Sequence, residues 1–294
     1  MIDVLLPFYG DPDMMRQTVA SVRAQTSRDW RLVVVDDGYP DPTIATWFAD
    51  LGDDRIEYHR NEENLGANLN YMKALSLASA EYVVVMGADD LMKTRYLADL
   101  ERAIATFPGV AIIETGVEII DETNRVVRPL VDRVKSRLTP SVEGPRELSG
   151  ESLMVSLLRG NWTYFPSLCW RRDVIEQIGF RPDFHVVQDL GLLLDVLRGG
   201  GSMALCPEVA FQYRRHTSSD SSLKTLTGER FAEERHYFRT IADELGSQGL
   251  VRAERAARRH LTSRLHAAAL VPSALSARKP AAAQGLLRHA LAKG

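Results

Sequence analysis

Short apolar runs separated by amphipathic stretches fill the first 121 residues of the chain. The runs Leu32–Val35 and Tyr82–Met86 are apolar without interruption and rich in β-branched residues, which is typical of strands buried on both faces. The stretches between such runs space apolar residues three and four apart, as at Met15, Val19 and Val22, which predicts helices. This alternation predicts an α/β fold with a mostly parallel central sheet, right-handed crossovers and flanking helices.

The same pattern places each element. The strands expected here cover residues 4–6, 32–35, 56–58, 82–86 and 110–113. Helices are expected over residues 11–26 and 41–51, from the turn 64–66 to Leu77, and over 95–107.

The pattern changes after residue 121. Residues 117–127 look like a hairpin around a turn at 122–124, and 128–149 read as a long, proline-containing loop of the kind that forms lids or disordered segments. Further elements are expected beyond that loop: helices at 151–159 and 187–197 and strands at 167–171, 203–205 and 210–213. Residues 221–294 are rich in Ala and Leu and predict a helical C-terminal extension.

Composition narrows the class of protein. Hydrophobic residues make up 45% of the 294 residues and charged residues 26%, as in a soluble globular protein. No apolar run reaches the roughly 18 residues of a membrane-spanning helix, and no signal peptide is recognised. Cys169 and Cys206 lack metal-ligand spacing and are expected to be buried free thiols. These features predict a cytoplasmic protein.

The charge is unevenly distributed. The net charge is −3, but residues 246–294 carry nine basic residues and one acid, +8, which leaves −11 for residues 1–245. A solvated helical face explains such a tail, and attraction to an anionic membrane or a phosphate-bearing acceptor explains it as well. The second interpretation predicts peripheral contact with the inner face of the membrane. Nucleic acid is not expected, because the tail has no aromatic residue to stack on bases.

Two acidic turns follow buried strands. Asp89 and Asp90 come directly after Tyr82–Met86, at a strand end where open α/β sheets bind ligands. Two carboxylates there favour a divalent metal with phosphate oxygens as its other ligands, although a solvated turn is the common alternative. Asp36 and Asp37 end the strand 32–35 and could accept hydrogen bonds from a base and a ribose, or form a capping turn.

Four further motifs have both a structural and a functional interpretation. Pro7, Phe8 and Tyr9 end the first strand, where an aromatic ring could stack on a base or simply form a turn. Asn64, two residues before Gly66, suits a helix cap. Asp189 opens a helix, where the dipole stabilises it and where it could also act as a general base. The segment 213–216, which ends in His216, offers cations and an imidazole for a diphosphate or metal, or forms a basic surface.

In this order, the motifs resemble the inverting family-2 glycosyltransferases of the GT-A nucleotide-sugar-binding fold. The resemblance covers roughly residues 1–216 and rests on Val4–Tyr9, Leu32–Gly38, Asn61–Gly66, Tyr82–Asp90 and Phe180–Leu194. It implies a glycosyltransferase domain over 1–220, with a nucleotide-sugar-binding half (1–121) and an acceptor-binding half (122–220), before the extension 221–294.

The resemblance also implies roles for single residues. The donor would be a nucleotide diphosphate sugar carrying UDP or dTDP, and the acceptor a hydroxyl of a lipid-linked glycan, a polysaccharide or a small molecule. Asp189 matches the catalytic base, and Asp89 matches the last acid of a motif that ligates Mn²⁺ or Mg²⁺. His216 lies where some members contact metal or phosphate. The remaining positions match or adjoin nucleotide-sugar contacts: Pro7, Phe8, Tyr9, Asp36, Asp37, Asn64, Gly66, Ala88 and Asp90.

The sequence departs from the family pattern at Gly87, where an Asp is usual, and at Gln188, where Glu is common. The loss of the acid at 87 leaves Asp89 as the main metal ligand. Rival functions remain: a sugar nucleotidyltransferase, a non-catalytic sugar-nucleotide-binding relative, and a glycosidase with two flanking carboxylates. A nicotinamide oxidoreductase is disfavoured, because no Gly-x-Gly-x-x-Gly motif follows a strand.

Overall fold

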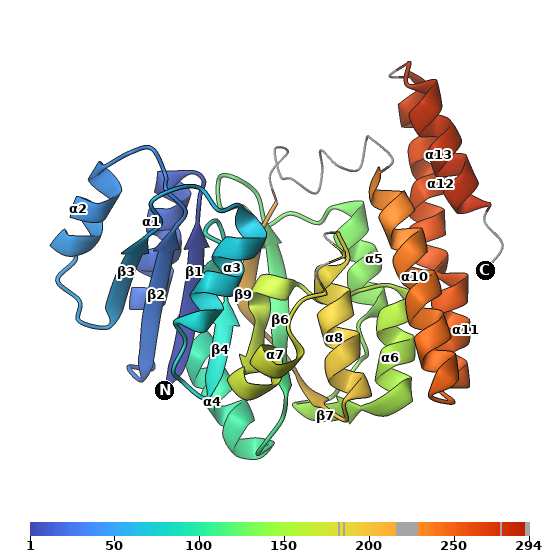
Figure 1. Ribbon diagram of the computed structural model, residues 1–294. Coiled ribbons are helices and arrows are strands. Elements are labelled where there is room, and N and C mark those ends of the chain that lie inside the picture. Colours follow the sequence, from blue (N-terminus) through green and yellow to red (C-terminus); the bar gives the residue numbers. More distant parts are fainter. Residues whose placement is uncertain (182, 185, 216–228, 277, 292–294) are drawn as a thin grey trace.

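The computed structural model describes residues 1–181, 183–184, 186–215, 229–276 and 278–291 (Figure 1). Strands and helices alternate in its first half, as expected: β1 (Ile2–Phe8), α1 (Pro12–Arg23), β2 (Trp30–Asp36), α2 (Thr43–Asp50), β3 (Ile56–Arg60), α3 (Ala67–Ser76), β4 (Tyr82–Val85), β5 (Leu91–Met92) and α4 (Tyr96–Thr106).

The second half is more mixed. Its elements are β6 (Ile112–Ile120), α5 (Leu130–Leu138), β7 (Arg146–Ser149), α6 (Gly150–Arg159), the 3₁₀ turn η1 (Phe165–Ser167), β8 (Leu168–Arg171), α7 (Arg172–Ile178), α8 (Gln188–Arg198) and β9 (Ser202–Arg214). The described C-terminal region is helical, as expected: α10 (Glu229–Ser247), α11 (Val251–Arg259), α12 (Leu261–Ser276) and α13 (Pro280–Ala290). None of the described helices combines the length and apolar character needed to cross a membrane.

One sheet organises the described chain. Its strand order is β3-β2-β1-β4-β8-β6-β9-β5, with β7 paired to β9. The strands β3, β2, β1 and β4 are parallel to one another, whereas β8 runs antiparallel to both of its neighbours. The predicted α/β fold with a helix-flanked sheet is therefore confirmed, with parallel pairing in the first half and mixed pairing in the second.

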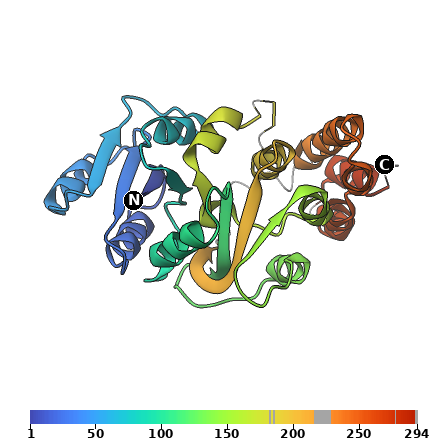
Figure 2. The ribbon, with the colours of Figure 1, turned by 90° about the horizontal axis from the view of Figure 1, so that it is seen from below.

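Helices cover both faces of the sheet. Because side chains alternate along a strand, Leu5 and Val33 pack into one core with α3, α6 and α8, while Val4 and Val34 pack into another with α1 and α4. Figure 2 shows these two layers edge-on, with α5 on the same side of the sheet as α1 and α4. The C-terminal helices α10 to α13 stand together at the end of the molecule beyond α8 (Figures 1 and 2).

Two predictions for the second half need correction. The expected hairpin at 117–127 is present only in part: residues 117–120 are the end of β6, and the chain turns back so that Val126 bridges Ile120 and the N–H of Val127 donates to the carbonyl of Ile119, but no second strand follows. The strand continues through a bulge beside Gly116, where a Cβ atom would lie 2.7 Å from the carbonyl oxygen of Pro207. The absence of a side chain at Gly116 thus allows β6 and β9 to pair along their whole length.

The segment 128–149 is not a long loop either. It contains α5 and β7, and β7 pairs antiparallel with β9. In α5, Asp132 is buried while Leu130 and Val131 are exposed, which reverses the usual amphipathic pattern. Periodicity therefore gave no sign of a core-facing helix.

Pro7 was expected to stop sheet pairing, but it lies inside β1, opposite Val35 of β2. The carbonyl of Leu5 accepts a hydrogen bond from the N–H of Met86 on the β4 side, 2.9 Å long. Residues two apart on a strand face the same neighbour, so Pro7 faces β4 beyond the end of that strand. The lack of a backbone N–H on Pro7 therefore removes no hydrogen bond between β1 and β4.

A buried ion pair ties the start of the sheet together. Asp3 has no exposed surface and accepts hydrogen bonds from Arg31 on β2, the shorter 2.8 Å long, and from the N–H groups of Ser79 and Ala80 before β4. Burial raises the pKa of Asp3, but these hydrogen bonds outweigh it and hold the pKa below its usual value. Three segments of the sheet are thus joined at one carboxylate.

The substitution Asp3→Ala should lower the free energy of unfolding by about 3 kcal/mol, because it leaves buried donors without an acceptor. The measurement is urea unfolding followed by circular dichroism. Asp173→Ala is the matched control, since Asp173 pairs with Arg171 but is 68% exposed, and we expect a change within about 0.5 kcal/mol. Equal effects of the two substitutions would contradict this account.

Candidate active site

The carboxyl ends of β1 and β2 meet, with Phe8 opposite Asp36. Phe8 has no exposed surface and its ring packs 5.1 Å from that of Tyr39. Its side chain is therefore unavailable to a nucleotide, and its prediction as a contact was wrong, because the β1 alternation directs it into the core. Tyr9 is 57% exposed and touches Tyr39 edge-on, so it is the aromatic residue of this motif that can reach a ligand.

Asp36 lies where the sequence predicted, but it is enclosed. Its carboxylate accepts hydrogen bonds from the N–H of Tyr39, 2.7 Å away, and from the hydroxyl of Tyr58, and Arg60 lies 3.5 Å from it. Burial and then the bond to Asp36 raise the pKa of Tyr58, so the phenol stays protonated and donates. A base contact at Asp36 requires one of these donors to move, and this role stays a prediction.

Asp37 has a structural role. One of its carboxylate oxygens accepts hydrogen bonds from the Asn61 side chain and the N–H of Leu65, and the other accepts the N–H of Gly66, at 2.7–2.9 Å. These bonds leave Asp37 1% exposed, so its carboxylate shapes the loop and is not presented to a nucleotide. Gly38 makes the turn with φ 71°, and a Cβ atom there would lie 3.2 Å from the backbone of Glu63.

The loop ends at the start of α3. Asn64 was expected to cap this helix, but the cap residue is Gly66, and the Asn64 side chain accepts the N–H of Gly66 at 3.0 Å. Gly66 has φ 82°, and a Cβ atom there would meet nothing within 4 Å. The first turn of α3 therefore presents its backbone to open space, and contact of Asn64 and Gly66 with a nucleotide sugar stays a prediction.

The second acidic turn follows β4. One Asp90 oxygen accepts the N–H of Arg214, at 2.8 Å, whereas the other is buried without a partner among the described residues. A Cβ atom on Gly87 would lie 2.6 Å from that oxygen and 2.9 Å from an oxygen of Asp89. Both carboxylates therefore converge on the space left by the missing side chain at Gly87, next to Ala88.

This convergence fits a hard cation. Burial, and then the charge of Asp89, raise the pKa of Asp90 well above its usual value. Ionisation of Asp90 beside Asp89 is therefore unfavourable unless a positive charge lies close to both carboxylates. Carboxylate oxygens are the ligands that Mg²⁺ and Mn²⁺ prefer. Among the described residues no group of three or more acidic, histidine or cysteine side chains is arranged to hold a metal ion, so other oxygens would have to complete the coordination.

The cations of the segment 213–216 are already engaged. Arg214 is 2% exposed, and its guanidinium donates to the carbonyls of Asp89 and Asp121 and to the Asn124 side chain. Arg215 forms a bidentate pair with Asp132 of α5 at 2.7–2.8 Å. Neither arginine is free for a diphosphate, and His216 lies outside the described residues.

Asp189 lies in the first turn of α8 and is held from outside the helix. Its carboxylate accepts a hydrogen bond from Asn161, 3.0 Å long, and one from the N–H of Leu190. Asn161 in turn accepts the hydroxyl of Thr163 at 2.8 Å, and the Thr163 carbonyl accepts Lys135 of α5 at 2.7 Å. A relay of polar contacts thus runs from α5 to Asp189.

Lys135 has an unusually low pKa. Burial lowers its pKa to about 8, although the nearby charge of Asp189 opposes the shift. Its ammonium also lies 4.2 Å from the centre of the Tyr164 ring. A polar segment of α5 therefore supports the loop that orients Asp189, a support that the sequence did not reveal.

Comparison with known sequences decides the family. The sequence model of glycosyl transferase family 2 matches residues 3–178, which is more than half of the chain. The chain belongs to glycosyl transferase family 2. It is therefore a glycosyltransferase, as the order of its motifs predicted.

Individual relatives are distant. An uncharacterized glycosyltransferase of Nostoc sp. is 28% identical over 184 residues, 60% of this chain and 52% of that protein, so the chain spans about half its length. A protein of Escherichia coli named UDP-Glc:alpha-D-GlcNAc-diphosphoundecaprenol beta-1,3-glucosyltransferase is 24% identical over 225 residues, covering 76% of this chain and 81% of that one.

Among solved structures, the crystal structure of S. aureus TarS in complex with UDP-GlcNAc has the same fold. Its TM-score is 0.61 at 13% identity, and the match covers 98% of this chain and 90% of that chain. The GT-A fold of the glycosyltransferase is thereby confirmed.

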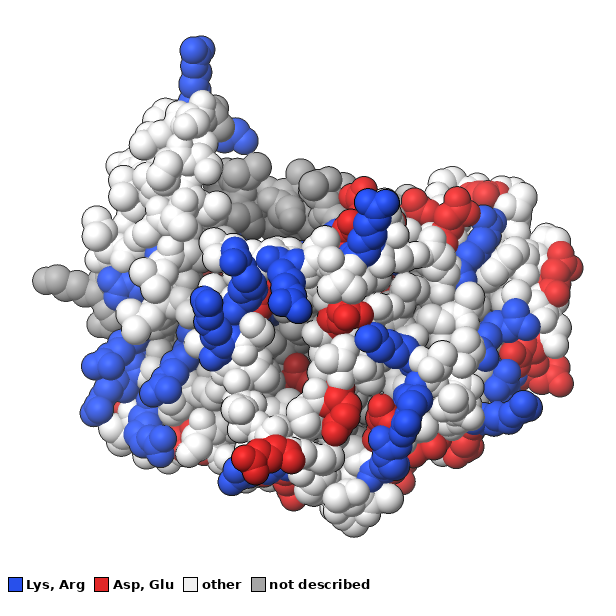
Figure 3. All heavy atoms as spheres, turned by 180° about the vertical axis from the view of Figure 1, so that it is seen from behind, with Lys and Arg blue, Asp and Glu red and all other residues white. Residues whose placement is uncertain are grey.

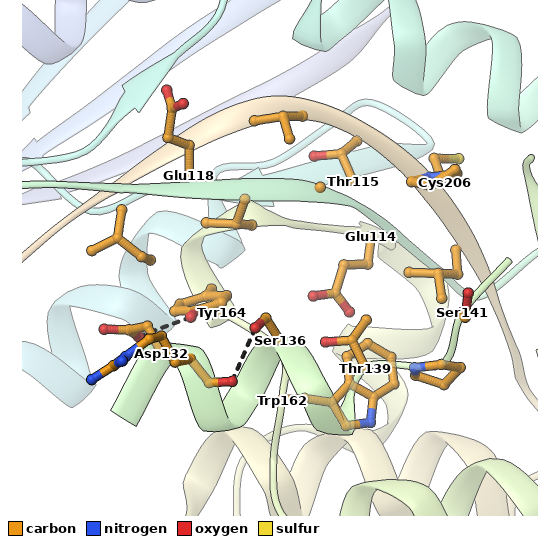
Figure 4. A pocket seen from close by; sticks show the side chains of 18 of the residues that line it. Glu114, Thr115, Glu118, Asp132, Ser136, Thr139, Ser141, Trp162, Tyr164 and Cys206 are labelled. Atoms are coloured by element: carbon orange, nitrogen blue, oxygen red, sulfur yellow. Dashed lines mark hydrogen bonds between the residues drawn. The ribbon is translucent and has the colours of Figure 1, made fainter. Parts of the chain in front are cut away.

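The glycosyltransferase also has a cavity of about 660 Å³ between α5 and the paired strands β6 and β9 (Figure 4). None of the predicted site residues that the structure describes lines it. The side chain of Glu114 extends from β6 into this cavity, and one of its carboxylate oxygens has no hydrogen-bond partner among the described residues. Burial raises the pKa of Glu114 well above its usual value, against the opposing charge of Lys135.

The shifted pKa of Glu114 makes a stability prediction. Because the fold favours its protonated form, its contribution is present below the unfolded pKa and is lost as pH rises through the raised folded value. Glu114→Gln, which cannot ionise, should therefore raise the melting temperature relative to the wild type at pH 8 by about 2 °C or more, and less at pH 5. Thermal unfolding at both values tests this, with the exposed Glu143→Gln as control. A gain larger at pH 5 than at pH 8 would refute it.

Proposed function

We propose that the protein transfers a sugar from a UDP-sugar to a hydroxyl group of a lipid-linked acceptor, with inversion at the anomeric carbon. The observation that carries the proposal is the paired acidic turn of Asp89 and Asp90 after β4, with Asp189 held by Asn161 on the acceptor half of the chain. UDP-GlcNAc in TarS supports the donor class. The diphosphoundecaprenol acceptor and UDP-glucose named for the Escherichia coli relative support the acceptor class, and with it a role in cell-envelope glycan synthesis.

Asp89 and Asp90 are the residues that would hold Mn²⁺ or Mg²⁺, with diphosphate oxygens as the remaining ligands. Such a cation, when bound, neutralises charge that grows on the departing diphosphate. Tyr9, which is exposed directly after β1, would cover the base of the nucleotide. The open first turn of α3 at Gly66 offers backbone N–H groups toward the same edge.

Asp189 acts as the general base. The acceptor oxygen attacks the anomeric carbon from the face opposite the diphosphate, and its proton passes to the Asp189 carboxylate. The new bond joins the acceptor oxygen to the anomeric carbon, and the bond from that carbon to the diphosphate oxygen breaks with its electron pair. Attack from the opposite face inverts the configuration. Asn161 fixes the orientation of the carboxylate through one oxygen.

The substitution Asp189→Asn should reduce transfer by about 10²–10⁴-fold while UDP binding stays near the wild-type level, because only proton removal is lost. Asn161→Ala should lower kcat about tenfold or more, with little change in KM for the donor, because the base is then poorly oriented. Donor consumption and product formation with a lipid-diphosphate sugar acceptor measure both effects. The exposed Asp183→Asn is the matched control. Wild-type turnover of Asp189→Asn would refute the base assignment.

The substitution Asp89→Asn should weaken binding of Mn²⁺ in the presence of UDP by roughly 10–100-fold or more, because it removes one of two converging carboxylates. Electron paramagnetic resonance of free Mn²⁺ measures the binding directly, without turnover. The exposed Asp54→Asn serves as control. Unchanged Mn²⁺ binding in Asp89→Asn, or undiminished transfer in EDTA, would exclude the proposed metal site.

A further inference from the structure

In the helix α5, the usual arrangement of buried apolar and exposed polar side chains is largely reversed. Three of its four apolar residues face solvent, with Leu130 67%, Val131 45% and Val134 39% exposed, whereas the fourth, Leu138 at its end, packs against the core. Its polar residues face the protein, where Asp132 is 5% exposed and Lys135 donates to the carbonyl of Thr163. Soluble proteins normally show the opposite arrangement.

The exposed apolar residues share one surface. Leu130 and Val134 are four residues apart and therefore lie one above the other on the helix, with Val131 beside them. Single exposed apolar side chains are common, but several on one short helix mark a contact surface. The described residues leave these three side chains exposed, so whatever buries them lies outside the described part of the chain.

The exposed charges in the stretch of sequence that carries this surface are of one sign. Every exposed charged residue between positions 125 and 137 is basic: Arg125, Arg128, Arg133 and Arg137. The acid of this stretch, Asp132, is buried and paired with Arg215. Figure 3 views the face of the molecule that carries α5: Lys and Arg side chains occur across this face, and Asp and Glu side chains are fewer on the half nearer the C-terminal helices.

We propose that the outward face of α5 lies on an anionic lipid bilayer, with Leu130, Val131 and Val134 among the lipid head groups and the neighbouring arginines on the phosphates. Apolar side chains interleaved with arginine are the pattern of helices that lie in a membrane interface. Arginine suits this place because its aliphatic stem tolerates apolar surroundings while its head reaches phosphate.

The two faces of α5 connect this surface to the active site. On the inward side, Asp132 binds Arg215 and the Tyr164 hydroxyl, and Lys135 supports the segment whose Asn161 holds Asp189. The bilayer would therefore lie on the opposite side of a single helix, about 10–12 Å across, from the contacts of that segment. If the proposed lipid-linked acceptor is correct, α5 brings the base to the surface where that acceptor resides. The membrane contact itself does not rest on the proposed function.

Co-sedimentation of the full chain with vesicles tests the proposal. We expect binding to phosphatidylcholine vesicles containing phosphatidylglycerol at a ratio of about three to one, and weak binding to phosphatidylcholine alone. The triple variant Leu130→Ser, Val131→Ser, Val134→Ser should bind the anionic vesicles about tenfold or more weakly.

The matched control is Leu265→Ser, Leu275→Ser, Leu287→Ser in the C-terminal helices, where the three side chains are 68%, 58% and 45% exposed. It should bind like the wild type. If instead the control loses binding and the α5 variant keeps it, the basic tail makes the contact and the proposal is wrong.

A charge series gives a second, independent readout, because exposed arginines can be replaced without disturbing the fold. Arg128→Gln, Arg133→Gln, Arg137→Gln should reduce binding and its dependence on salt, whereas Arg252→Gln, Arg255→Gln, Arg259→Gln on α11 should not. Equal losses in the two sets would show unspecific attraction and overturn the proposal.

Two further measurements separate the remaining outcomes. Mn²⁺ binding with UDP should be the same in the α5 variants and the wild type, so failure of the nucleotide site and failure of membrane contact can be told apart. The mass of the wild type in solution should be that of one chain. A dimer that the triple serine variant converts to a monomer would show that a second copy covers α5, which would refute the bilayer as its partner.

Discussion

The buried guanidinium of Arg214 holds the two halves of the site together. It stands at the end of β9, yet it donates to the carbonyl of Asp89 in the turn after β4 and to the 121–124 turn after β6. Its own N–H binds the carboxylate of Asp90. A charge that is 2% exposed stays buried only with all its donors satisfied, so these segments are fixed relative to one another.

That constraint determines the character of the acidic turn. With its backbone fixed from β9, the turn keeps the carboxylates of Asp89 and Asp90 near each other, and the absence of a side chain at Gly87 leaves room for both. Their mutual repulsion and their burial make a proton or a cation favourable there. Gly87 therefore does more than remove an acid from the turn. Its missing side chain leaves the space in which the Asp90 carboxylate lies beside that of Asp89.

The sequence predicted the strands that are buried on both faces of the sheet. Continuous apolar runs identified β2 and β4, and the rule that ligands gather at strand ends located Asp36 and Asp89. It could not tell that both adjacent acids are buried and accept internal hydrogen bonds, so Asp37 was assigned to a nucleotide although it binds the 61–66 loop. Nor could it separate a buried arginine from a surface cluster, because Arg214 gains its partners from segments far away in the chain.

Contacts between segments far apart in the chain also explain why the sequence of α5 was predicted to be a loop. A nine-residue helix is marginal alone, so α5 depends on tertiary contacts. Leu138 at its end packs against the core, but the other described contacts are polar: Asp132 with Arg215 and Tyr164, and Lys135 with Thr163. Where the inward face of this helix makes hydrogen bonds to the segment that holds Asp189, little of that face is left for apolar residues. Its apolar residues must then face outward, where they cost least if another apolar phase receives them. The inverted pattern thus follows from one helix serving two neighbours.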